Sequence, residues 1–230
     1  MKGLLTGLVV VLVLAVAADR VALVLTERAV AAQLQTSGSL SSRPDVSVRG
    51  IPFLTQALSG RYDDVELSAT EVTAGGGRLS QLEASLRGVH VPLSAALSGS
   101  VTSVPVDRLQ ATVTLSYRDL DMQLRDRRLA VSPDGDLLRV TGSVQVLGRT
   151  LSVTALSAVS LSGTSVIVTA KRFEVGNTAA DRVVTGALAG RLDFVVRIGR
   201  LPYGLALTGV RVSPDGVVAT AAGSNAVLHR

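Results

Sequence analysis

The side chains that could carry out chemistry are few and far apart in this sequence. His90 and His229 are the only histidines, and cysteine is absent. A Ser-His-Asp triad would have to use one of these histidines, and the G-x-S-x-G elbow that presents a nucleophilic serine does not occur. The absence of cysteine also excludes thiol catalysis, cysteine-based zinc sites and iron–sulfur clusters. His90 stands between apolar residues, so we expect an ordinary strand residue rather than a catalytic base.

Close pairs of carboxylates occur at Asp63-Asp64 and at Asp119-Leu-Asp121. Acid–base catalysis by such a pair requires one member in an apolar setting that shifts its pKa. Both pairs fall at expected strand starts or turns, where water would solvate them. We therefore assign them no catalytic role, and we expect neither a bound metal nor a cofactor.

The basic residues do not form a nucleic-acid-binding pattern. Lysine occurs only at positions 2 and 171, so nearly all of the positive charge is arginine, and the formal net charge is +5. The densest basic run, Arg125-Asp-Arg-Arg128, is interpreted as a charged turn, and aromatic residues make up only 3% of the chain. Gly75-Gly-Gly77 lacks the spacing of a phosphate-binding loop. We therefore expect no nucleic-acid partner and no enzymatic activity.

The N-terminus has the pattern of an export segment. Lys2 is followed by an uncharged stretch from Gly3 to Ala18, and Ala15-Val-Ala17 fits the small-residue site at which signal peptides are cleaved. This stretch of 16 residues is short for a spanning helix, which needs about 20 apolar residues. Residues 1–18 are therefore predicted to be either a signal peptide or an N-terminal membrane anchor. Both alternatives predict export. No linker rich in Pro or Ser divides residues 19–230, so we expect a single β-rich domain there.

Alternation of apolar and polar residues with period two dominates the rest of the chain. It is clearest from Leu109 to Tyr117. The same pattern recurs at residues 65–69, 82–86, 138–146 and 192–198. Such strands have one apolar face and one solvent-exposed polar face, which is typical of antiparallel sheets. Helices are predicted over 19–35, 52–58 and 181–192. The predicted fold class is α+β and mostly β.

One sequence pattern occurs twice. Residues 129–143 align with residues 210–224, and both segments contain Val-Ser-Pro-Asp-Gly followed later by Gly-Ser. Pro-Asp-Gly favours a tight turn, so we expect a hairpin at each position. The two hairpins are either similar by chance or related sub-units of one sheet.

The apolar strand faces are built from small side chains. Hydrophobic residues make up 47% of the chain, mostly Val, Leu and Ala, and there is no Trp. Small aliphatic residues fill a β interior incompletely, which favours an apolar groove or cavity that takes up an apolar guest. For an exported protein beside a membrane, that guest would be a lipid. The alternative is a solid, well-packed β core.

Four segments together resemble a known family. They are residues 49–56 (Arg-Gly-Ile-Pro-Phe-Leu-Thr-Gln), residues 60–66, residues 87–93, and residues 201–216, which begin Leu-Pro-Tyr-Gly. In these segments the chain is similar to the LmeA-like phospholipid-binding domains of actinobacterial cell envelopes. One departure is Ile51, where the family's pattern has Phe.

The resemblance implies a periplasmic or envelope-facing protein at the outer face of the cytoplasmic membrane. It implies binding of a phospholipid, with phosphoinositide as one possibility, in support of lipid or lipoglycan metabolism or transport. The implied fold is similar to tubular lipid-binding proteins, with a long curved antiparallel sheet wrapped around a helix and leaving a groove. The family supplies no catalytic residue to carry over. A structural or partner-binding envelope protein with a filled core remains the alternative.

Candidate ligand-binding residues lie around the first of these segments. We expect an apolar lip or cavity wall formed by Ile51, Phe53, Leu54 and Leu58. Tyr62 and Tyr203 are candidates for the boundary between that wall and water, where Tyr often lies. Arg49 and Arg61 flank the segment and are candidate ligands of a lipid phosphate. Ordinary packing and surface charge are the alternative for all eight residues.

Overall fold

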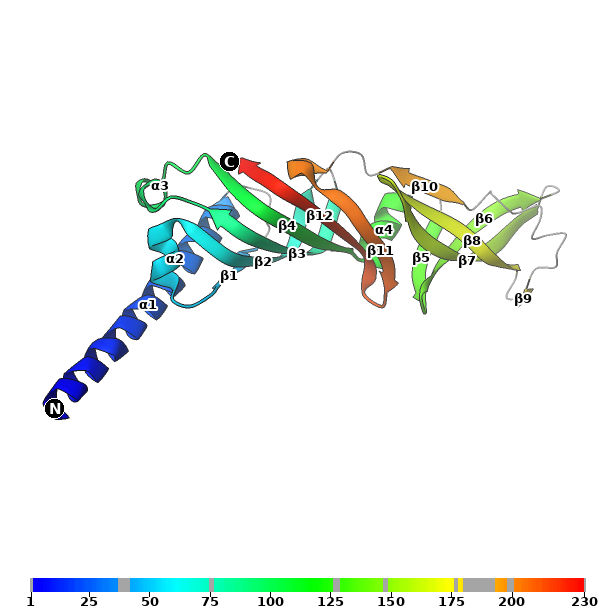
Figure 1. The fold of residues 1–230 in the computed structure, drawn as a ribbon. Coiled ribbons are helices and arrows are strands. Elements are labelled where there is room, and N and C mark those ends of the chain that lie inside the picture. Colours follow the sequence, from blue (N-terminus) through cyan, green and yellow to red (C-terminus); the bar gives the residue numbers. More distant parts are fainter. Residues whose placement is uncertain are drawn as a thin grey trace. The chain divides into compact units, whose positions relative to one another are not determined.

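The structure is a computed structural model of the chain, shown in Figure 1. It describes residues 2–36, 42–74, 77–125, 129–146, 149–175, 178–179, 193–197 and 201–229. The helices are α1 (Lys2–Thr36), α2 (Phe53–Ser59), α3 (Leu93–Ser98), α4 (Tyr117–Leu124) and the 3-10 turn η2 (Pro202–Gly204). The first seven strands are β1 (Asp45–Arg49), β2 (Arg61–Ala74), β3 (Gly77–His90), β4 (Ser103–Leu115), β5 (Leu129–Asp134), β6 (Leu137–Val146) and β7 (Arg149–Ser162). The others are β8 (Ser165–Val175), β9 (Thr178–Ala179), β10 (Phe194–Arg197), β11 (Ala206–Ser213) and β12 (Gly216–His229).

The predicted fold class, α+β and mostly β, is confirmed. The strands divide between two sheets, one in the order β1-β2-β3-β4-β12-β11 and the other in the order β10-β8-β7-β6-β5, with β9 beside β8. The pairs whose register is described are antiparallel, as the alternating pattern predicts. The predicted groove is not shown by the fold.

The chain forms two compact units. Unit 1 comprises Met1–Thr70, Glu83–Gln110 and Gly223–Arg230, and unit 2 comprises Glu71–Leu82 and Ala111–Ala222. The long strands β2, β3, β4 and β12 each contribute residues to both units.

The interior of each unit is built from small aliphatic side chains. In unit 2 a buried cluster consists of Val131, Leu138, Val140, Val168 and Val212. Buried residues of unit 1 include Val46, Val48, Val89, Val106 and Leu109. Among the described residues, the largest side chains with almost no exposure are three valines and Ser157. The scarcity of aromatic residues predicts an interior of this kind.

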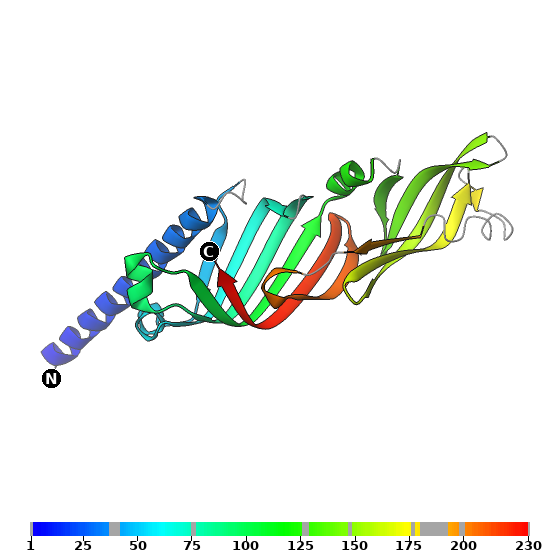
Figure 2. The ribbon, with the colours of Figure 1, turned by 90° about the horizontal axis from the view of Figure 1, so that it is seen from above.

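Helix α1 changes its environment partway along its length. The large apolar residues from Leu8 to Leu14, and Val16 after them, are exposed on every side. From Asp19 onward one stripe of the helix is buried or half-buried, at positions 19, 23, 27 and 31, which are spaced to lie on one face. Figures 1 and 2 both show the N-terminal half projecting beyond α2. By length and composition α1 could cross a membrane, although a signal sequence would meet the same criterion.

Several predicted elements are confirmed, with small shifts. The helix predicted over 19–35 is the second half of α1, and the one predicted over 52–58 is α2. The repeated segment forms two hairpins, β5–β6 and β11–β12, but Gly135 and Asp136 make the first turn whereas Pro214 and Asp215 make the second. The helix predicted over 181–192 lies outside the described residues.

One prediction was wrong at the end of β4. The alternation predicted a strand up to Tyr117, with Asp119 and Asp121 solvated at a strand start or turn. Instead Ser116 caps α4, because its hydroxyl accepts a hydrogen bond of 3.2 Å from the Asp119 amide. The Asp119 carboxylate is buried and accepts hydrogen bonds from the hydroxyls of Ser80 and Ser116. Asp121 accepts one from the Val131 amide at 2.7 Å.

Candidate functional site

Helix α2 buries one face and exposes a mixed face, on which Leu54 and Leu58 lie beside Thr55 and Ser59. Phe53, Gln56 and Ala57 point inward, and Phe53 is only 3% exposed. On the outside, Leu54 is partly exposed, Leu58 is 73% exposed, and Ile51 just before the helix is 84% exposed. A helix at a protein surface normally turns polar residues outward. Packing within the chain therefore does not explain the outer apolar residues of α2.

A residue from α1 caps the start of α2. Pro52 stands at the N-cap position and provides no side-chain hydrogen bond to the helix. The buried carboxylate of Asp19 accepts a hydrogen bond of 2.8 Å from the Leu54 amide in the first turn, and it also pairs with Arg20. The first amides of a helix lack partners within the helix, so this contact joins α1 to α2.

Gln56 joins α2 to the two strands that flank it. Its amide nitrogen donates to the Arg49 carbonyl at 3.2 Å, and its oxygen accepts from the Asp63 amide at 2.9 Å. A side chain on Gly50 would collide with Gln56, since an added Cβ would lie 2.5 Å from its amide nitrogen. The Gln56 side chain thus holds the end of β1 and the start of β2 against one helix.

Helix α3 lies beside the end of α2. The Val91 amide donates a 2.9 Å hydrogen bond to the Gly60 carbonyl, and Gly60 ends α2 with a φ of 68°. A Cβ on Gly60 would lie 3.1 Å from the Pro92 backbone at the start of α3. Leu97 of α3 is 79% exposed. We call Ile51, Leu54, Leu58 and Leu97 the apolar tip of unit 1; α2 and α3 lie at the same end of this unit in both views (Figures 1 and 2).

The two predicted phosphate ligands are both paired with carboxylates. Arg49 contacts Glu66 at 2.6 Å, and Arg61 contacts Asp107 at 3.0 Å. The hydrogen bond from Arg49 lowers the pKa of the Glu66 carboxyl and raises the pKa of Arg49 itself. A phosphate would have to share these guanidinium groups or displace their partners.

The aromatic candidates separate into two environments. Phe53 and Tyr62 are buried together, with ring centroids 6.1 Å apart. Burial raises the pKa of the Tyr62 phenol. Tyr203 is exposed in η2 and belongs to unit 2. The structure thus brings the candidates at positions 49–62 together in unit 1, with Phe53 and Tyr62 inside and the three apolar candidates outside.

His90 has a carboxylate partner that the sequence analysis did not identify. Its Nε2 lies 3.0 Å from Asp107, whose other carboxylate oxygen binds Arg61. Two members of a catalytic triad are therefore adjacent, but in the described structure no serine hydroxyl is hydrogen-bonded to the His90 ring. No group of three His, Asp or Glu side chains within the described ranges could hold a metal ion.

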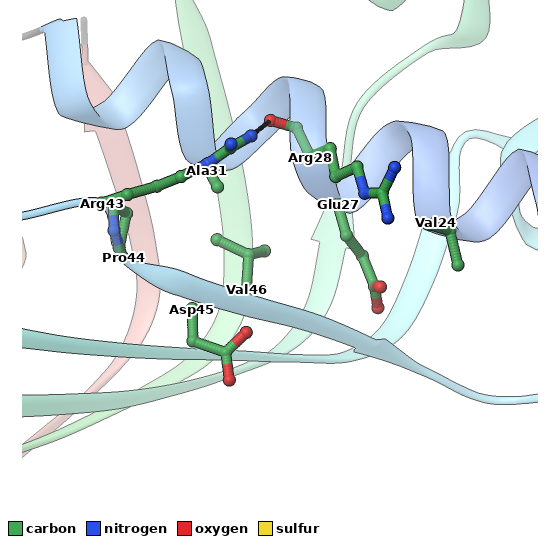
Figure 3. Close-up of a pocket in the computed structure, with 8 residues that line it drawn as sticks. All are labelled: Val24, Glu27, Arg28, Ala31, Arg43, Pro44, Asp45 and Val46. Atoms are coloured by element: carbon green, nitrogen blue, oxygen red, sulfur yellow. Dashed lines mark hydrogen bonds between the residues drawn. The ribbon is translucent and has the colours of Figure 1, made fainter.

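A pocket of about 420 Å³ lies between the second half of α1 and β1. Its lining combines two cations, two anions and apolar side chains: Val24, Glu27, Arg28, Ala31, Arg43, Pro44, Asp45 and Val46 (Figure 3). Arg43 reaches across to the Arg28 carbonyl at 2.6 Å, and Glu27 accepts from the Val48 amide at 2.9 Å. The volume is within the usual range of ligand pockets, about 300–1,000 Å³. The balanced charges suit a polar group better than an acyl chain.

Three structural residues of this region were missed by the sequence analysis. Asp19 was only the first residue of a predicted helix, and Gln56 and Leu97 were given no role. The position of Asp19 directly after an apolar stretch is a signal that could have singled it out. None of the eight predicted ligand-binding residues lines the pocket between α1 and β1.

Comparison with known proteins gives one match. The sequence model described as LmeA-like phospholipid-binding matches residues 17–222. No curated protein and no solved structure shows significant similarity. The match starts close to Asp19, where α1 passes from its exposed half to its packed half. This family is a family of lipid-binding domains and not a known family of enzymes, and it supports lipid binding by this protein. Because the match covers most of the 230 residues, the chain belongs to the LmeA-like phospholipid-binding family.

Proposed function

We propose that the protein binds a phospholipid at the outer face of the cytoplasmic membrane and catalyses no reaction on it. In this proposal residues 1–18 direct export or anchor the chain, and residues 19–230 act as one lipid-binding domain. The observation that carries the proposal is the family match over residues 17–222. It leaves outside the family's domain the stretch from Leu8 to Val16, in which the large apolar residues of α1 are exposed.

In the cell envelope, this lipid binding would support lipid or lipoglycan metabolism or transport. Phosphoinositide is the headgroup we propose to test first, because the arginines Arg49, Arg61 and Arg43 offer donors suited to phosphate. These arginines contact Glu66, Asp107 and the Arg28 carbonyl, respectively. Binding of a phosphate would therefore require an exchange of partners.

A second candidate function is a structural or partner-binding envelope protein without a lipid. The observation that favours it is the packing inside unit 2, where Val140, Val153 and Ala155 have almost no exposed surface. A core filled in this way leaves no room for acyl chains at these positions.

Analysis of co-purifying lipid separates the two functions. The chain is purified in the length that its cells accumulate, transferred from detergent into an amphipathic polymer, extracted with organic solvent, and analysed by mass spectrometry. An unrelated single-span membrane protein treated in the same way measures the background of lipid that merely surrounds a helix.

Phospholipid well above that background, close to one molecule per protein, is the expected result. Enrichment of phosphatidylinositol over its share in the membrane would support the phosphoinositide headgroup. An extract that matches the background would contradict lipid binding and favour the structural protein.

A further inference from the structure

We infer that the apolar tip of unit 1, Ile51, Leu54, Leu58 and Leu97, is a membrane-docking surface. It enters the interface of the same bilayer that receives the first half of α1. The inference rests on the proposed function for the presence of a membrane, and it goes further by naming the surface that touches it.

The length of the apolar stretch places the membrane surface close to Asp19. The uncharged stretch from Gly3 to Ala18 has 16 residues. At about 1.5 Å per residue it is roughly 24 Å long, whereas the hydrocarbon core is about 30 Å thick. A short span draws the flanking residues toward the bilayer. The lipid headgroups must then reach the level of Asp19 and Arg20.

Helix α2 is held at that same level. The Asp19 carboxylate accepts the hydrogen bond from Leu54 at 2.8 Å, so the first turn of α2 touches α1 at the end of the apolar stretch. From there α1 runs back along β1, because Glu27 meets Val48 and the Arg28 carbonyl meets Arg43. The apolar tip therefore lies at the end of unit 1 where α1 enters it.

The exposure of the tip fits a lipid contact. Its residues come from two separate helices and the loop before α2, so the apolar character does not arise from one local pattern. Interfacial helices sink their apolar faces about 5–10 Å into the boundary between headgroups and acyl chains. A protein partner would also bury such a patch. We favour the bilayer because the stretch of α1 that is apolar and exposed on every side ends just before Asp19, whose carboxylate binds the Leu54 amide.

The absence of cysteine makes a site-specific test straightforward. Single substitutions Leu58→Cys, Leu97→Cys and Thr70→Cys are labelled with a fluorophore that responds to polarity, and the full-length chain is reconstituted into phosphatidylcholine–phosphatidylglycerol vesicles. Thr70 is exposed near the other end of β2, roughly 30 Å along the strand from Arg61. It is the matched control.

Labels at positions 58 and 97 are expected to shift to shorter wavelength. They should also be quenched by brominated phospholipid at least about twofold more strongly than the label at position 70. In the variant Leu97→Asp, quenching of the label at position 58 should weaken while circular dichroism stays unchanged, because Leu97 is exposed. Labels at 58 and 97 that behave like the label at 70 would overturn the inference.

Lipid extraction distinguishes failure of this inference from failure of the proposed function. If the tip labels report water but phospholipid still co-purifies, the docking surface is wrong and lipid binding stands. If the tip labels report water and the extract contains only background lipid, both proposals fail. A second copy of the chain on the tip would give a blue shift without quenching by brominated lipid, which also overturns the inference.

Discussion

The two halves of helix α1 have similar backbones and opposite environments. From Leu8 to Val16 the side chains are apolar and exposed on every side, whereas from Asp19 to Leu34 one face is packed on β1 and α2. Leucine and valine occur in both halves. The halves differ in what surrounds them, because only the second half has a stripe of contacts that includes polar groups such as Asp19 and Glu27.

This difference indicates that the two halves of α1 suit different surroundings. An apolar helix with no preferred face suits a uniform apolar surrounding such as a bilayer. A helix with one packed stripe suits the surface of a protein. The change occurs at Asp19, whose carboxylate caps α2. If the two halves are adapted to different surroundings, the first half should depend on lipid and the second half on protein contacts.

Charges in the first half should abolish membrane association. In the double variant Leu8→Arg, Leu12→Arg, each arginine at the centre of a span costs about 2.5–3.5 kcal/mol on the insertion scale. We expect the protein to disappear from the carbonate-washed membrane fraction or to fail to be exported. The double variant Leu8→Ala, Leu12→Ala is the control. An unchanged membrane fraction in the arginine variant would show that the first half of α1 does not depend on lipid.

Removing a side chain from the inner face of α2 should lower the stability of the fold, whereas removing the exposed side chain of Ile51, just before the helix, should not. Phe53→Ala removes a buried ring and should lower the free energy of unfolding by about 3–5 kcal/mol. Ile51→Ala, at an exposed position, should change it by less than about 0.5 kcal/mol. Urea unfolding followed by circular dichroism measures both. Equal losses would show that Ile51 is packed, which would remove it from the apolar tip.

The polar contacts of Gln56 should contribute less than the ring of Phe53. Gln56→Ala leaves the Arg49 carbonyl and the Asp63 amide without this partner, at a cost of about 1–3 kcal/mol. Gln56→Glu keeps an acceptor for Asp63 but places a buried carboxylate oxygen against the Arg49 carbonyl, so its stability should fall at least as far as that of Gln56→Ala. Amide hydrogen exchange at Asp63 checks the assignment. Exchange that is equally slow in both variants would contradict it.

The ion pair of Arg49 with Glu66 should have the smallest effect. Pairing with Arg49 lowers the pKa of Glu66 below its ordinary value of 4.5 in the folded protein. The pair therefore stabilises the fold above about pH 4.5, and this contribution is lost as the pH falls through the lowered pKa. The side chains are 61% and 41% exposed, so water screens the pair and the effect is weak. Between pH 6 and pH 3 the wild type should lose slightly more thermal stability than Glu66→Gln; parallel curves would exclude the pairing.

Local patterns in the sequence predicted much of the fold. Alternation with period two located β2, β3, β4 and β6, since that spacing follows from the strand itself. The start of α2 was predicted to within one residue, because Pro favours the first helical turn and the structure has Pro52 at the N-cap position. Helix α4 was missed, although Ser116 followed three residues later by Asp119 is a capping pattern.

The candidate site depended on contacts that local patterns do not contain. Asp19 has the chemistry of a helix cap, but the helix that it caps begins at Phe53, and no local rule links those positions. Helices α2 and α3, which carry Leu58 and Leu97, are joined by the hydrogen bond between Gly60 and Val91. Tertiary packing likewise decides which face of α2 points inward. The sequence therefore predicted the same role, part of an apolar lip or cavity wall, for the buried Phe53 and the exposed Leu58.

Cross-linking with a phospholipid that carries a photoactivatable acyl chain tests lipid binding most directly. The full-length chain is reconstituted with the probe, irradiated and digested, and the labelled peptides are sequenced by mass spectrometry. We expect label in peptides of residues 42–229 outside α2 and α3, reduced by excess unlabelled phosphatidylinositol. Label confined to residues 3–18 and to α2 and α3 would contradict a lipid held by the domain, because it would show contact with the bilayer alone.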